Sequence, residues 1–184
     1  METQPQTGLT YEDMVALPDD NLFRELIGGE LIVTPSPTTS HQLAVAAIMF
    51  GLAKYAEEHG GVVLPSPMDV LISRRDVLQP DVLFFTAEHR DRIQDPYIGE
   101  PPDLVVEVSS PSTRKIEYLR KRDLYEGFGI REFWLVDQEA RRVEVYRLSK
   151  DRFETPLLLG IDDVLTSPLM PGFELPLQPV LQPL

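Results

Sequence analysis

The chain contains no cysteine, and this absence removes several classes of site. Without thiols it forms no disulfide framework, no thiolate metal site and no cysteine nucleophile. Long hydrophobic runs are also missing, because the longest one, residues 43–50, is far shorter than the ~20 residues of a membrane-spanning helix. Residues 1–5 have neither the basic region nor the apolar core of a secretory signal. We therefore expect a cytoplasmic protein that does not enter a membrane.

Positive charge is scarce. The chain has 17 Lys and Arg against 30 Asp and Glu, a net charge of −13, which argues against a large nonspecific nucleic-acid surface. The basic residues are unevenly distributed, since ten of the 17 lie within residues 110–150, beside seven acidic residues. This segment could form a phosphate-facing patch, although a solvated helix face is the more common origin of such a run.

Motifs of several enzyme classes are absent as well. The chain has no G-x-S-x-G nucleophile elbow, no G-x-x-x-x-G-K-[ST] phosphate loop and no G-x-G-x-x-G dinucleotide fingerprint. The three histidines, His41, His59 and His89, lack the spacing of a metal site. His41 is the most interesting of them because it begins a helix that we expect to be buried, although a structural role is the more common one.

The order of helical and strand patterns predicts one mixed α/β domain, and 184 residues are enough to bury a sizeable core. Thr10 and Asp13 fit a capping box that opens a short helix before Pro18. The longer helices are expected at about 41–59 and, after a cap at Ser112 or Thr113, up to about residue 127. Strands are expected at 21–27, 30–34, 62–64, 69–72, 82–85, 104–108, 132–136 and 142–148, with a tight turn at 28–29. The last two are expected to form a hairpin or to be successive strands.

The two ends of the chain are expected to lie outside this domain. We predict that residues 1–9 are disordered and that residues 10–175 form the domain. The Pro-rich chain after residue 155 is expected to be extended, and residues 176–184 to form a tail that wraps the body or contacts a partner.

The most unusual stretch is PPDLVVEVSSPST, residues 101–113. It reads as an apolar strand buried on both faces, with Glu107 in its middle. A buried carboxylate costs several kcal/mol unless it is compensated. Asp81 follows Pro80, which cannot continue a ladder, and so begins another apolar strand. If the two strands are neighbours, Asp81 and Glu107 converge at one sheet edge and can hold Mg²⁺. The alternative is a structural Glu107 that pairs with an arginine or caps the nearby turn.

A lysine on the following helix is a candidate partner for these carboxylates. At 100° per residue, Lys121 shares one broad face with Glu117, Leu124, Tyr125 and Phe128. The apolar members of this face indicate that it packs on the sheet, which would hold Lys121 inward. An ammonium there suits the orientation of a hydrolytic water or the stabilisation of transition-state charge. The alternative is a lysine that snorkels to solvent.

The residue strings resemble those of a known family. Pro80-Asp81 and Glu107-Val108-Ser109 resemble the PD-(D/E)XK nuclease superfamily. The strings QPDVLFF, PPDLVVEVSSPST, KRDLYEGFGIREFWLVD and VEVYRL, preceded by RELIGGELIVTPSPTTSHQ, are similar to its Uma-type branch over roughly residues 10–175. The resemblance implies a restriction-endonuclease-like αβββαβ core with extra N-terminal strands and a C-terminal hairpin, and a divalent-metal site at the edge of a mixed sheet.

The resemblance also implies the roles of individual residues. Carried over by position, Asp81 and Glu107 are the ligands of Mg²⁺ or Mn²⁺. The superfamily pattern places a lysine two residues after the glutamate, where this chain has Ser109. In the Uma-type branch the lysine lies on the following helix, where Lys121 matches.

Three further residues are considered as candidate catalytic residues, and they are not ranked equally. Glu30 and His41 match recurrent positions of the family and are taken as candidate catalytic residues. Asp103 forms a second Pro-Asp pair, but it stands only four residues before Glu107, so it ranks below Asp81.

The leading hypothesis is therefore a Mg²⁺- or Mn²⁺-dependent endonuclease that hydrolyses DNA phosphodiester bonds, with Lys121 assisting the water nucleophile. One alternative is a non-catalytic binding or scaffold module that keeps the nuclease fold, and another is a hydrolase of a non-nucleic phosphate ester. A homodimer is expected by analogy, because a small nuclease that cuts two strands needs two sites.

Overall fold

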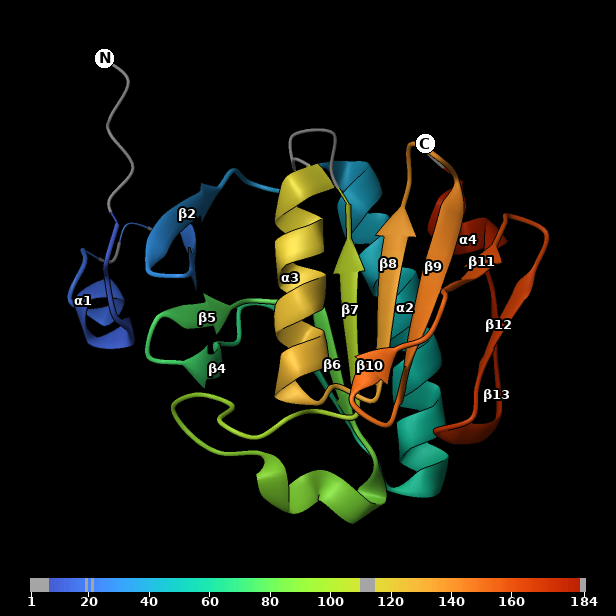
Figure 1. Ribbon diagram of the computed structural model, residues 1–184. Helices are drawn as coiled ribbons and strands as arrows, with labels where there is room; N and C mark the ends of the chain where they lie inside the picture. Colours follow the sequence, from blue (N-terminus) through green and yellow to red (C-terminus); the bar gives the residue numbers. More distant parts are fainter. Residues whose placement is uncertain (1–6, 19, 21, 110–114, 183–184) are drawn as a thin grey trace.

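A mixed sheet runs through the centre of the computed structural model, which describes residues 7–18, 20, 22–109 and 115–182 (Figure 1). Its strand order is β10-β9-β8-β7-β6-β3, and β11 also pairs with β9. The β7–β8 pair is parallel, whereas the other pairs of this sheet are antiparallel. The strands are β3 (Val62–Pro65), β6 (Val82–Phe85), β7 (Leu104–Val108), β8 (Glu132–Asp137), β9 (Arg142–Ser149), β10 (Arg152–Phe153) and β11 (Leu157–Leu159). The predicted mixed α/β class and the predicted β8–β9 hairpin are both confirmed.

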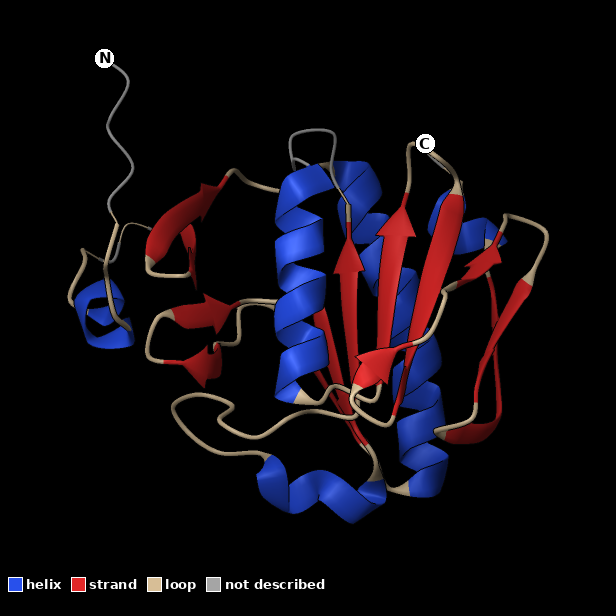
Figure 2. Cartoon of the chain, viewed as in Figure 1, coloured by secondary structure: helices blue, strands red, loops and turns tan. Residues whose placement is uncertain are grey.

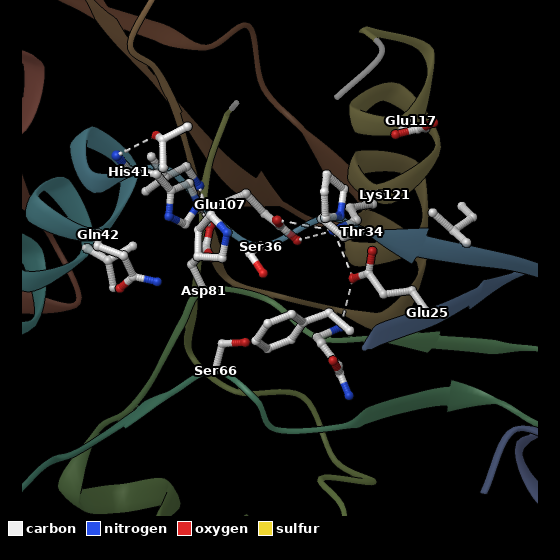
Figure 3. Close-up of a pocket in the computed structure, with 18 of the residues that line it drawn as sticks. Glu25, Thr34, Ser36, His41, Gln42, Ser66, Asp81, Glu107, Glu117 and Lys121 are labelled. Atoms are coloured by element: carbon white, nitrogen blue, oxygen red, sulfur yellow. Dashed lines mark hydrogen bonds and ion pairs between the residues drawn. The ribbon is translucent and has the colours of Figure 1, made fainter. Parts of the chain in front are cut away.

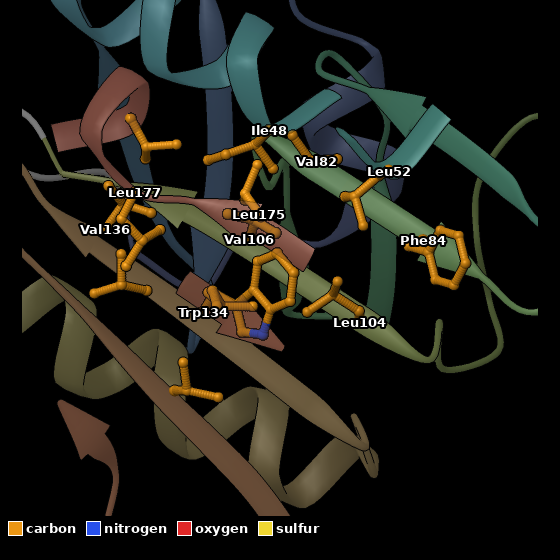
Figure 4. Packing of buried hydrophobic residues seen from close by; sticks show 14 of the residues in the cluster. Ile48, Leu52, Val82, Phe84, Leu104, Val106, Trp134, Val136, Leu175 and Leu177 are labelled. Atoms are coloured by element: carbon orange, nitrogen blue, oxygen red, sulfur yellow. The ribbon is translucent and has the colours of Figure 1, made fainter. Parts of the chain in front are cut away.

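Two long helices cover the two faces of this sheet, α2 (Thr39–His59) on one and α3 (Lys115–Phe128) on the other (Figure 2). Successive side chains of a strand point to opposite faces. Val106 of β7 accordingly packs in the cluster that contains Ile48 of α2 (Figure 4), while Val105 packs in the cluster that contains Tyr125 of α3. Glu107 has the same parity as Val105, so its side chain lies on the α3 face.

The connection between β7 and β8 explains why α3 lies where it does. Parallel neighbours need a crossover connection, which is usually a helix, and α3 is that crossover. The predicted start of this helix at Ser112 or Thr113 lies outside the described residues, and its end at Phe128 agrees with the prediction.

A smaller antiparallel sheet, ordered β2-β1-β5-β4, flanks the domain. Its strands are β1 (Phe23–Ile27), β2 (Glu30–Thr34), β4 (Val70–Ser73) and β5 (Asp76–Leu78). The predicted β1–β2 hairpin is confirmed. Its turn residues Gly28 and Gly29 have φ values of +63° and +77°, a region that glycine adopts without steric cost. Strand β5 was not predicted, and the chain passes from it directly into β6 through residues 79–81.

Residues 7–9, which were predicted to be disordered, belong to the described structure. Residues 1–6 of the predicted disordered segment 1–9 lie outside the described residues. The Leu9 N–H, however, donates a hydrogen bond of 2.9 Å to the Gly29 carbonyl, and Leu9 packs against the cluster of Met14, Leu26 and Val77. Helix α1 (Tyr11–Val15) then begins with the predicted capping box at Thr10.

The end of the chain packs on the body, as one alternative of the prediction for residues 176–184 expected, but residues 178–181 are helical and not extended. Strands β12 (Val164–Ser167) and β13 (Met170–Pro176) form a hairpin, and helix α4 (Gln178–Leu181) follows it. Val180 and Leu181 are buried and belong to the cluster that α2 covers. These apolar side chains make the last turn part of the core. A short 3₁₀ helix, η1 (Ala87–Arg92), lies in the loop before β7.

The packing of α4 gives a stability prediction. Leu181 is fully buried, so we expect Leu181→Ala to lower the free energy of unfolding by about 2–4 kcal/mol through lost burial and cavity formation. Leu158→Ala is the matched control, since Leu158 is 57% exposed, and should stay within about 0.5 kcal/mol of the wild type. Urea unfolding followed by circular dichroism measures both. Equal stability of the two variants would contradict the placement of α4.

No helix in the described part of the chain combines the length and apolarity needed to cross a membrane.

Candidate active site

A pocket of about 200 Å³ lies where the small sheet meets the main domain (Figure 3). Its wall is built from β1, β2, the segment 35–38 that follows them, the first turns of α2, the end of β3 with Ser66, the chain between β5 and β6, the end of β7, and α3. Its charged lining residues are Glu25, His41, Asp81, Glu107, Glu117 and Lys121. Of the five predicted catalytic residues, all but Glu30 are therefore brought together in this pocket.

Glu107 lies in this pocket as a nearly inaccessible carboxylate with two side-chain partners. Only 4% of the residue is exposed. The Lys121 ammonium donates to both of its oxygens at 3.0 and 3.1 Å, and the Tyr125 hydroxyl donates to Oε1 at 2.6 Å. Burial, reinforced by the carboxylates of Glu25 and Asp81, raises the pKa of Glu107 to about 7, although Lys121 and the Tyr125 hydrogen bond act in the opposite direction. Its partners therefore compensate the buried charge only in part.

Lys121 stands between two carboxylates. Besides Glu107, its Nζ contacts Glu25 Oε1 at 2.8 Å, and only 7% of the residue is exposed. Burial alone would lower the pKa of Lys121, but Glu107 and Glu25 outweigh that effect and raise it above its ordinary value. The side chain is thus a permanent ammonium at neutral pH. The helical period predicted that Lys121 points inward, and the structure confirms this position.

Glu25 is a residue of this site that the sequence analysis missed. It comes from β1, is 4% exposed, and accepts a hydrogen bond of 2.8 Å from the Gln79 N–H in addition to its contact with Lys121. Its cross-strand neighbour on β2 is Ile32, which also lines the pocket. The sequence does show a carboxylate next to Leu26 and Ile27 in a short strand. This pattern, however, does not show which face of the hairpin is buried, so it could not identify Glu25 as a pocket residue.

Glu30, the candidate chosen from the same hairpin, lies elsewhere. It begins β2 and forms an ion pair of 2.9 Å with Arg120 of α3, and both side chains are more than a third exposed. Arg120 also donates to the Ile27 carbonyl at 2.9 Å. Glu30 is not among the residues that line the pocket, so it joins the hairpin to α3 on the outside of the site.

Asp81 and His41 form the second half of the site. The carboxylate of Asp81 accepts the Val108 N–H at 2.7 Å and lies 3.2 Å from His41 Nε2. The backbone of His41 is fixed by Thr38, whose hydroxyl oxygen caps α2. Burial alone would lower the pKa of His41, but the hydrogen bond and charge of Asp81 raise it instead. His41 Nδ1 is buried and has no hydrogen-bond partner among the described residues.

Asp103, the second Pro-Asp aspartate, belongs to a different cluster. It is completely buried, and its carboxylate accepts hydrogen bonds from the Thr86 N–H and hydroxyl at 2.8 and 2.9 Å and contacts His89 Nδ1 at 2.7 Å. Arg131 donates to it at 2.9 Å. Burial would raise the pKa of Asp103, but these hydrogen bonds outweigh burial and lower it. Asp103 does not line the pocket and has the surroundings of a structural carboxylate.

The donor set of the pocket suits a hard cation. Within the described ranges there is no group of three or more His, Asp and Glu side chains that could hold a metal ion. Mg²⁺, however, is commonly bound by one or two carboxylates together with waters and substrate phosphate oxygens. Asp81 and Glu107 provide two carboxylates in one pocket, and no thiolate is present to favour a softer metal. The two carboxylates are therefore of the chemical type that would hold a hard divalent cation such as Mg²⁺ or Mn²⁺.

Comparisons with known proteins agree with this fold. A family model described as "Uma2: Putative restriction endonuclease" matches residues 11–178. The solved structure of a "putative nuclease belonging to DUF820" from Anabaena variabilis is similar, with a TM-score of 0.78 over 94% of this chain and 97% of that chain at 17% sequence identity. The likeness confirms the predicted restriction-endonuclease-like fold. A search of curated proteins gave no match.

Proposed function

Because the chain belongs to the Uma2 family of restriction-endonuclease-like proteins, we propose that it is a metal-dependent nuclease acting on DNA phosphodiester bonds. Asp81 and Glu107 would hold Mg²⁺ or Mn²⁺, and Lys121 would assist the attacking water. The observation that carries this proposal is the contact of Lys121 Nζ with Glu107 at 3.0 Å, in the pocket that Asp81 also lines. The divalent cation, when bound, lowers the pKa of its water and polarises the scissile phosphate.

The role of Lys121 follows from its protonation state. The raised pKa of Lys121, caused by Glu107 and Glu25 against the opposing effect of burial, means that the amine cannot accept the proton of the attacking water near neutral pH. It therefore acts as a hydrogen-bond donor that positions the water or stabilises the negative charge of the transition state. Such preorganised charge is effective because a buried site has a low effective dielectric.

The other groups of the pocket orient these reacting residues. Tyr125 fixes the carboxylate of Glu107 through its hydroxyl, and the Val108 N–H fixes that of Asp81. Glu25 restrains Lys121 from the opposite side. Each reacting group is thus held by at least one hydrogen bond from a helix, a strand or the segment beside it, as an active site requires.

A non-catalytic binding module is the second candidate, and two observations favour it. Lys121 already compensates part of the charge of Glu107 without a metal, and the net charge of −13 is unusual for a nucleic-acid enzyme. Calorimetric titration with Mn²⁺ separates the two candidates, since a nuclease must bind the cation and Asp81→Asn must weaken the binding. If the wild type binds no Mn²⁺, the nuclease proposal fails and the non-catalytic binding module is the remaining candidate.

The nuclease proposal predicts a metal-dependent activity that depends on Asp81. We expect the wild type to cleave plasmid or single-stranded DNA with Mg²⁺ or Mn²⁺ and to be inactive in EDTA. Asp81→Asn should lower the rate at least ~100-fold, since it removes charge that holds the cation and stabilises the transition state. Asp91→Asn is the control, because Asp91 is exposed on η1 and does not line the pocket. Equal cleavage by wild type and both variants would indicate a contaminating nuclease and contradict the assignment.

A further inference from the structure

The reacting groups of the proposed nuclease lie inside a small pocket and not on an open surface. Glu107 is 4% exposed and Lys121 is 7% exposed, and the side chain of Asp81 is 18% exposed. The pocket has a volume of about 200 Å³, so it can hold a small group such as a base or a phosphate and not a section of a double helix. A base that enters it must first leave the stack of the helix.

Part of the pocket wall is apolar and has no use in metal binding. Phe23 and Ile32 come from β1 and β2, Pro35 and Pro37 from the segment after them, and Val45 from α2. These side chains stand in the same pocket as the carboxylates. An apolar wall beside a phosphate site matches the two halves of a nucleotide, whose base is flat and apolar on its faces and whose phosphate is charged. Stacking of an unpaired base on an aromatic side chain is the usual way in which proteins hold single strands.

Some polar groups that line the pocket suit a base edge without selecting one base. Thr34, Ser36 and Gln42 are drawn around the pocket in Figure 3 and line it. Hydroxyl and amide groups both donate and accept hydrogen bonds, so they can contact the edge of any of the four bases. This arrangement favours recognition of an unpaired nucleotide over recognition of a sequence.

The pocket offers few cationic groups to a phosphate backbone. Proteins that bind duplex DNA neutralise many phosphates with Lys and Arg. Among the described residues that line this pocket, the cationic side chains are Lys121 and His41, and both already contact carboxylates. The whole chain carries a net charge of −13. Binding energy must therefore come from contacts with the base and sugar and from the bound cation.

We infer that the pocket takes one unpaired nucleotide, so that the substrate is single-stranded DNA or a strand end freed from a duplex, and an intact duplex is a poor substrate. This inference rests on the proposed nuclease function. It names the substrate class of the same site, with Phe23 as the stacking surface and Gln42 at the base edge. A single-strand nuclease needs one site per cut, so it does not need the homodimer expected for duplex cleavage.

Binding of labelled oligonucleotides tests the inference without requiring turnover. Fluorescence anisotropy is measured with wild type in Ca²⁺ and in EDTA, for a single-stranded 15-mer, the same sequence as a duplex, and a single strand in which abasic spacers replace the bases. We expect the single strand to bind at least ten-fold more tightly than the duplex. The abasic strand should lose most of this advantage, because it offers no base to stack.

Two phenylalanine variants locate the effect in the pocket. Phe23→Ala should raise the Kd of the single strand by about 5- to 150-fold, which is the 1–3 kcal/mol of one stacked base, and should leave the Kd of the abasic strand unchanged. Phe50→Ala is the matched control, since Phe50 is 75% exposed on α2 and does not line the pocket. The abasic comparison uses the wild type alone, so it decides the question even if Phe23→Ala is unstable.

The outcomes separate this inference from the proposed function. Duplex binding as tight as single-strand binding, equal binding of abasic and normal strands, or no binding of any oligonucleotide would overturn the inference. Metal-dependent cleavage that prefers an intact duplex would uphold the nuclease and overturn only the single-strand preference. A clear single-strand preference without any cleavage would support the nucleotide pocket and count against catalysis.

Discussion

Lys121→Met is expected to lower the rate of DNA cleavage by about 10²- to 10³-fold, as does the loss of one preorganised charge or donor in other active sites. Methionine keeps a similar length and an unbranched stem, so the substitution removes the ammonium and little of the packing. In this variant Glu25 and Glu107 lose the positively charged Lys121 ammonium, which both carboxylates contact. Burial and these like charges already raise the pKa of Glu107 to about 7, and Lys121 opposes that rise. Removing Lys121 removes this opposing effect, which favours the neutral form of Glu107 and disfavours binding of the divalent metal ion.

The neighbouring residue provides the control for this prediction. Arg120 precedes Lys121 on α3 but pairs with Glu30 outside the pocket, so Arg120→Met should change the cleavage rate by less than about three-fold, as expected for a partly exposed ion pair of small energetic weight. Both variants are assayed at saturating Mn²⁺, and circular dichroism confirms that each is folded under assay conditions. Full activity of folded Lys121→Met, or an equal loss in Arg120→Met, would refute the catalytic role.

Asp103→Asn is expected to cost about 3–5 kcal/mol of folding free energy, because it breaks a buried charge cluster. The Asp103 carboxylate contacts Thr86, His89 and Arg131. An asparagine keeps one acceptor oxygen and turns the other position into a donor, which then faces other donors. Activity at a temperature where the variant is folded should remain within about three-fold of the wild type, since Asp103 does not line the pocket. Urea unfolding and a cleavage assay on the same preparation measure both effects.

The effect of pH on this variant follows from the direction of the shift. Burial would raise the pKa of Asp103, but the hydrogen bonds from Thr86, His89 and Arg131 lower it below the unfolded value, which is about 3.9. A lowered pKa in the folded state stabilises the protein above the unfolded pKa, and this stabilisation is lost as the pH falls through the folded pKa. The stability difference between wild type and Asp103→Asn should thus be full at pH 7 and shrink below about pH 4.

If Asp103→Asn is as stable as the wild type but has lost its cleavage activity, Asp103 is a catalytic residue and its structural role is contradicted.

The parts of the site that were predictable depend on local geometry. The alternation of side chains along a strand and the helical period can both be read from the sequence. Together they place Glu107 on the strand and Lys121 on the following helix so that the two side chains can face each other. Pro80 marks the point where β6 begins and thereby places Asp81 at the start of this strand. The comparison with the Uma-type strings then suggested what these residues do together.

The parts that could not be predicted depend on how separate elements pack. Glu25 reaches the pocket because the small sheet docks against the main domain, and a hairpin sequence does not show where it will dock. Glu30 was chosen instead, but its partner Arg120 comes from a distant helix. The C-terminal helix α4 was missed because proline was taken as evidence of extended chain. Pro179 lies in its first turn, where proline leaves no hydrogen bond unmade.

The way in which Lys121 is held also has a consequence for how the molecule folds. Lys121 and Glu107 are only 14 residues apart and belong to one strand–helix–strand unit, so little chain entropy is lost when they meet. Glu25 reaches the same ammonium from a hairpin near the beginning of the chain, and closing that much longer loop costs more. We therefore expect the β7–α3–β8 unit to form early with its ion pair already in place. The small sheet would dock afterwards. The Lys121 ammonium, already paired with Glu107, would then fix the position of the small sheet through its contact with Glu25.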